Sequence, residues 1–67
     1  MPDIKTLIEK GLILEDDFIN TYLSVIKDEG FSYLFQNNET EAKQILQTLI
    51  DESTEHKTTL QKILASL

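Results

Sequence analysis

Cysteine and arginine are both missing from this sequence of 67 residues, which also contains only two glycines and one proline. Without cysteine the chain forms no disulfide and offers no thiolate to zinc, so neither device strengthens its core. The six basic residues are all lysines, and twelve acidic residues bring the formal charge to -6 at pH 7. Because phosphate backbones and anionic membranes are held by clustered cations, we expect neither nucleic acid nor a membrane as a partner.

Long hydrophobic runs are also absent. No stretch approaches the roughly 18 apolar residues of a membrane span, and the first three residues, Met-Pro-Asp, are not the basic start of a signal peptide. There is no glycine-rich phosphate loop, and the single histidine has no nucleophile and orienting acid for a triad. We therefore expect a soluble, cytoplasmic protein with neither of these two catalytic motifs.

The length allows one small domain with a marginal core. A domain of this size buries only about 60% of the surface that its unfolded chain exposes, and such domains usually need a supplement. Because disulfides are excluded, oligomerisation or a bound metal remains.

Apolar residues at helical spacing predict a first helix over residues 3–29. Asp3 is a suitable N-cap, and Gly30 is the expected end, because glycine adopts the left-handed conformation of many helix ends at no steric cost. Gly11 costs about 1 kcal/mol relative to alanine inside a helix, so the helix either bends there or begins properly near Leu12. The apolar residues of this stretch are Ile4, Leu7, Ile8, Leu12, Leu14, Phe18, Ile19, Tyr22, Leu23, Val25 and Ile26.

A second helix is predicted over residues 39–66, where apolar residues recur without glycine or proline. Asn38 followed by Glu41 resembles a capping box, in which each side chain accepts a backbone N–H at the start of the helix. The connection over residues 30–38 is rich in aromatic residues. The residues expected to close the end of the core are Phe31, Leu34 and Phe35.

Two such helices joined by a short connection predict an all-α fold, an antiparallel helical hairpin. Each helix spans about 27 residues, or roughly 40 Å. The apolar face of each helix is wider than a single line of contact, so one hairpin does not enclose a core by itself. We therefore expect the chain to form a homodimer or higher homo-oligomer, with two hairpins making a four-helix bundle.

Polar residues interrupt the expected contact line of both helices. On the second helix the line consists of Leu46, Leu49, Ser53, His56, Leu60, Ile63 and Leu67. On the first helix it consists of Ile4, Ile8, Gly11, Glu15, Phe18, Tyr22 and Val25. Counting from the connection, Glu15 and Ser53 should lie level, with His56 one turn farther on. Polar side chains that meet in a core need each other, water or a metal.

A different contact line on the first helix, through Leu7, Gly11, Leu14, Phe18, Thr21 and Val25, leaves a second interpretation open. Glu15 then lies on a solvated acidic flank with Asp16 and Asp17. His56 is in that case a hydrogen-bonded core or interface residue, stabilised as an imidazolium by Glu52 one turn before it.

Residues 49–64, LIDESTEHKTTLQKIL, resemble the second helix of the ferritin-like and rubrerythrin-like families. In those families a glutamate three residues before a histidine, within an acidic run, supplies ligands to a di-iron site. Residues 14–22, LEDDFINTY, are similar to the family's helix that carries a ligand glutamate seven residues before a tyrosine. With both segments present, the chain resembles half of a ferritin-like domain.

The resemblance implies that Glu15 and His56 bind a metal, with Glu52 as a possible third ligand and Tyr22 orienting them. The metal would be iron, or else manganese or zinc, which suit carboxylate and imidazole ligands. With iron, oxidation of the ferrous ion by dioxygen is the implied reaction. Ser53 stands where the family has a bridging glutamate, and this departure favours an alternative: a non-catalytic interaction module that binds no metal and presents acidic faces to a basic protein.

Overall fold

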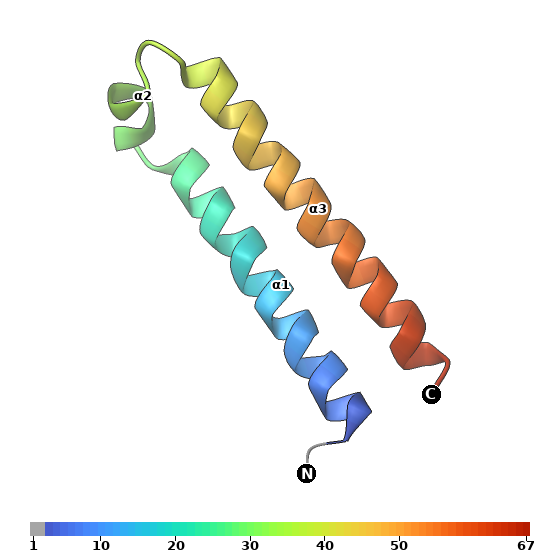
Figure 1. Ribbon diagram of the computed structural model, residues 1–67. Helices are drawn as coiled ribbons and strands as arrows, with labels where there is room; N and C mark the ends of the chain where they lie inside the picture. Colours follow the sequence, from blue (N-terminus) through green and yellow to red (C-terminus); the bar gives the residue numbers. More distant parts are fainter. Residues whose placement is uncertain (1–2) are drawn as a thin grey trace.

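A computed structural model describes residues 3–67, and every regular element in that range is a helix. The elements are α1 (Ile4–Lys27), the short α2 (Gly30–Leu34) and α3 (Glu39–Ala65). Helices α1 and α3 lie side by side and antiparallel, with α2 across the turn that joins them (Figure 1). The predicted all-α hairpin is therefore confirmed. None of the helices in the described range is long and apolar enough to cross a membrane.

Helix α1 begins where the sequence predicts but ends earlier. An Asp3 carboxylate oxygen accepts the Thr6 backbone N–H at 2.7 Å, and this bond lowers the pKa of Asp3. The helix continues through Gly11 without a break. It ends at Lys27, because Asp28 has an extended backbone. The prediction that Gly30 ends the helix in a left-handed conformation was wrong. Gly30 instead begins α2, and its N–H donates to the Asp28 side chain at 2.7 Å.

The connection closes the core end mainly through Phe31. This residue is buried, and its ring lies 4.9 Å from the ring of the partly buried Phe35. The Lys43 ammonium group lies 5.9 Å from the centre of the Phe31 ring on the other helix. The expectation for Leu34 was wrong, because α2 turns this side chain into solvent.

The start of α3 uses other bonds than the predicted capping box. Asn38 is the N-cap residue, but its side chain makes no capping bond. Glu39 instead accepts the Ser32 hydroxyl at 2.8 Å and pairs with Lys43 at 3.0 Å. The Lys43 contact, followed by the Ser32 bond, lowers the pKa of Glu39. The bond between Ser32 and Glu39 thereby links the connection to the first turn of α3.

The contact line between α1 and α3 differs from the predicted lines. Its members are at least partly buried: Ile8, Leu12, Glu15, Ile19, Tyr22 and Ile26 on α1, and Leu46, Ile50, Ser53, Lys57, Leu60 and Leu64 on α3. Lys57 takes the place expected for His56, because its aliphatic stem covers the contact line while its ammonium group pairs with Asp16. Phe18, Val25, Ile63 and Leu67, which the predicted lines buried, are exposed.

The hairpin buries little by itself. Within the described residues the buried side chains are Phe31, Ala42, Ile50 and Ser53, and no large side chain is fully buried. The reason is geometric, because two helices share one contact line and leave their other apolar residues without a partner.

Candidate functional site

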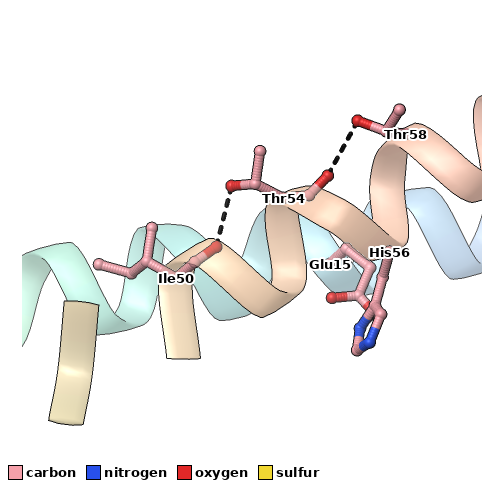
Figure 2. Close-up of polar contacts among 5 residues, drawn as sticks. All are labelled: Glu15, Ile50, Thr54, His56 and Thr58. Carbon is pink, nitrogen blue, oxygen red and sulfur yellow. Dashed lines mark hydrogen bonds and ion pairs between the residues drawn. The ribbon is translucent and has the colours of Figure 1, made fainter. Parts of the chain in front are cut away.

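Glu15 and His56 meet near the middle of the hairpin. Glu15 Oε1 lies 3.2 Å from His56 Nδ1, which links α1 to α3. The Glu15 side chain is 17% exposed and that of His56 is 62% exposed, so the pair reaches from the contact line to the surface. Figure 2 shows the two side chains together on one side of α3, while Thr54 and Thr58 point to the other side. Of the two interpretations of Glu15, the structure supports the inward one.

The second carboxylate oxygen of Glu15 has no partner. Oε2 is buried and makes no hydrogen bond to any described residue. A buried carboxylate oxygen without a donor is destabilising, and such atoms in folded proteins usually bind a water, an ion or another chain. Glu15 therefore has unused capacity to bind a donor or a cation.

A hollow of about 210 Å³ opens beside this pair. Its lining comes from both long helices: Glu15, Phe18 and Tyr22 on α1, and Leu49, Glu52, Ser53 and His56 on α3. The structure thus brings all three predicted ligands to one hollow, with Tyr22 and the buried Ser53 in its wall. However, no three histidine, aspartate or glutamate side chains within residues 3–67 lie close enough to hold a metal ion.

The register of the hairpin differs slightly from the predicted one. Glu15 contacts His56 directly, and Asp16 pairs with Lys57 beside it. His56, and not Ser53 one turn before it, is therefore level with Glu15. Ser53 borders the same hollow. The residue count started from Gly30 and Asn38, whereas α1 already ends at Lys27.

An exposed apolar surface runs along the hairpin on the side of this hollow, and we call it the groove face. On α1 it consists of the exposed Leu7, Leu14, Phe18 and Val25. On α3 it consists of the exposed Ile45 and Ile63 at the ends and of the partly buried Leu49 with the exposed polar residues Glu52 and His56 between them. The α1 residues follow one another at steps of seven and four, and those of α3 at steps of three, four and seven, so each set forms one stripe. Phe18 shares the central hollow with the α3 stripe, and Val25 shares a second hollow of about 280 Å³ with Ile45.

The groove face has a signal in the sequence. Each helix carries two apolar stripes with nearly the same spacing, separated by roughly 100° around the helix axis. The predicted line on α3 and the first predicted line on α1 mixed members of both stripes, whereas the alternative line on α1 followed the stripe that remains free. Separating the stripes identifies one for the partner helix in the chain and one that remains free.

Comparison with protein-family models, with curated proteins and with solved structures found no match for this chain. The resemblance to ferritin-like domains therefore stays a prediction that rests on the two short segments described above.

Proposed function

We propose that this hairpin is a self-associating half of a four-helix bundle and that two copies bind through their groove faces. The observation that carries this proposal is the set of exposed apolar residues on α1 and at both ends of the α3 stripe, beside a core that buries few side chains. Apolar patches of this length on a folded protein mark interaction surfaces, because their exposure to water is unfavourable. A second hairpin would cover both stripes at once.

The dimensions of the hairpin suit this role. It measures 47 × 18 × 15 Å, and the groove face extends along its long axis. The two larger dimensions give a long side of the whole hairpin an area close to the roughly 800 Å² that each partner buries in a stable protein interface.

The first prediction concerns the mass of the protein in solution. Sedimentation equilibrium at micromolar concentration is expected to give at least twice the 7.7 kDa chain mass. The melting temperature is expected to rise with protein concentration, since association stabilises the folded form by mass action. A monomer whose melting temperature is independent of concentration contradicts the proposal.

Metal binding is a second candidate function, and the unpartnered Glu15 Oε2 favours it. One chain brings Glu15, His56 and Glu52 to the hollow, but within residues 3–67 it assembles no cluster of three ligands. A dimer joined through the groove faces brings a second set of these side chains to the same interface. Carboxylate and imidazole ligands suit iron, manganese or zinc, and bound iron would supply oxidation chemistry with dioxygen.

The second prediction tests this candidate through stability. Zinc or ferrous iron added to metal-free protein is expected to raise the melting temperature. At a metal concentration of 100 times Kd, the free energy of unfolding should increase by about 2.7 kcal/mol. His56→Leu should abolish this rise, whereas Glu55→Gln, at an exposed position outside the hollow, should keep it. Ser53→Glu should destabilise the metal-free protein by crowding carboxylates and should enlarge the rise on metal addition.

Equal melting temperatures with and without metal, in both the unmodified protein and Ser53→Glu, contradict the metal site. A metal-indifferent dimer would leave the interaction module as the function. With twelve acidic residues against six lysines, a basic protein is the partner that its charge favours.

A further inference from the structure

The groove face has apolar ends, and the middle of its α3 stripe is polar. Val25 and Ile45 border one hollow near α2. Leu7 and Ile63 lie toward the opposite end. A Cβ atom placed on Gly11 would lie 3.4 Å from Leu60 Cδ1, so α1 and α3 are level at these two residues. Between these ends the α3 stripe carries Glu52 and His56, which border the central hollow. A partner that covers the apolar ends must also accommodate an acid and an imidazole.

We propose that the occupant of this face is a second copy of the chain in one particular orientation, with α3 antiparallel to α3 of its partner. This inference rests on the proposed self-association and specifies its geometry. Glu52 of each chain then lies opposite His56 of the partner subunit. The two reciprocal pairs decide the direction and the register of the dimer.

Symmetry limits the alternatives to two. Two hairpins that meet through the same face with their helices aligned, as in a four-helix bundle, are related by a two-fold axis either along the helices or perpendicular to them in the plane of the interface. With the axis along the helices, α3 lies beside the partner's α1 at the same level. Glu52 and His56 would then face the apolar stripe that contains the partner's Leu14 and the partner's Phe18. Burying charged groups against apolar side chains is unfavourable.

The perpendicular axis brings α3 beside the partner's α3, running in the opposite direction. Residues at equal distances on either side of the axis then face each other. Glu52 and His56 lie two residues before and two residues after Thr54, so an axis at that level pairs each with the other on the partner.

The same axis also matches the apolar ends. Ile45 lies nine residues before Thr54 and Ile63 lies nine residues after it, so Ile45 faces Ile63 of the partner subunit. Both side chains are exposed in the isolated hairpin. The α3 stripe is thus complementary to a copy of itself that runs in the opposite direction. An acid faces an imidazole at the centre, and apolar side chains face each other at the ends.

Glu15 adds to the central layer from α1. Its Oε1 already lies 3.2 Å from His56 Nδ1 of its own chain, and its Oε2 is unpartnered. Polar groups of this kind inside helical bundles contribute less to stability than to the choice of partner and register, because a wrong register leaves them unpaired. Glu52 and His56 are therefore residues that determine the orientation of the dimer.

The test uses the absence of cysteine in the natural sequence, so that any disulfide reports only on introduced positions. Ile45→Cys, Ile63→Cys and Leu7→Cys are prepared as single variants, and all three positions are exposed in one hairpin. Pairs of variants are mixed, unfolded and refolded together, and then oxidised mildly. The antiparallel arrangement predicts that Ile45→Cys crosslinks with Ile63→Cys at least about tenfold faster than Leu7→Cys does with Ile63→Cys. Ile13→Cys, on the other side of α1, is the control and should not crosslink.

The role of Glu52 and His56 is tested in the same chains with the double substitution Glu52→Leu and His56→Leu. The dimer should persist, but the tenfold preference should fall to about twofold or less, because an all-apolar stripe accepts both orientations. Preferential crosslinking of Leu7→Cys with Ile63→Cys overturns the antiparallel arrangement. An unchanged preference in the double-leucine protein overturns the role of Glu52 and His56. A monomer in sedimentation, by contrast, overturns the self-association on which the inference rests.

Discussion

Phe18→Glu is expected to convert the dimer into a monomer at micromolar concentration, with the dissociation constant rising at least about 100-fold. Phe18 is 46% exposed in the single hairpin and lies in the wall of the central hollow. Its ring stacks on Tyr22 with the centroids 6.4 Å apart, which presents a flat aromatic surface to a partner. A glutamate at this position would place another negative charge beside Glu15 and Glu52 in an interface that excludes water.

A matched control for this substitution lies on the same helix. Ile13 is also apolar and is 61% exposed, but it is not part of the groove face. Ile13→Glu should leave the dissociation constant within about twofold of the unmodified value, since exposed positions outside an interface have small effects. Sedimentation equilibrium of both variants measures the difference. Equal weakening by the two substitutions would show that added charge, and not the groove face, controls association.

Phe31→Ala is expected to cost about 3–5 kcal/mol of folding stability, the range typical of a buried phenylalanine. Phe31 is only 4% exposed and packs between Phe35 and the Lys43 side chain. Small domains have total stabilities of about 5–15 kcal/mol, so this loss should leave the chain close to unfolding at room temperature. Urea titration followed by circular dichroism measures it.

Tyr33→Ala provides the comparison within the same short helix. Tyr33 is 81% exposed, so its truncation should change stability by no more than about 0.5 kcal/mol. Losses of similar size for Phe31→Ala and Tyr33→Ala would contradict a closing role for Phe31. Similar losses would indicate instead that the exposed side of α2 contributes to folding stability as much as its buried side.

Much of the fold was determined by the sequence alone. The helical recurrence of apolar residues and the capping carboxylate at Asp3 predicted two long antiparallel helices. These features are local, because helical periodicity and an N-cap depend on residues within a turn or two of each other. The same local character explains why the aromatic connection was recognised and why burial of Phe31 could be expected.

Details at the helix ends depended on contacts that local rules do not specify. Helix α1 ends at Lys27 and not near Gly30, and the Asp28 side chain that follows it accepts the Gly30 N–H at the start of α2. Glu39 takes part in bonds to Ser32 and Lys43, where the sequence predicted a cap by Asn38. Several residues at a helix end can satisfy the same free backbone groups, and the surrounding packing selects among them.

The candidate site was predicted in part. The sequence indicated that Glu15 turns inward and that His56 lies near it, and the 3.2 Å contact between them agrees. The position of His56 at the edge of the helix pair, with Lys57 on the contact line, was decided by tertiary packing. From sequence alone a lysine is predicted to lie on the surface. The long aliphatic stem of Lys57 nevertheless covers part of the apolar contact line, while its ammonium group pairs with Asp16.

Only the tertiary structure decided which apolar stripe packs inside the hairpin and which remains free. Both stripes recur at similar steps, so periodicity alone gives them equal weight. The rotation of each helix is set by how well facing side chains interlock along its whole length, a property of two helices together. Ile50 and Ser53 were thereby buried, and Phe18 and Val25 were left on the groove face.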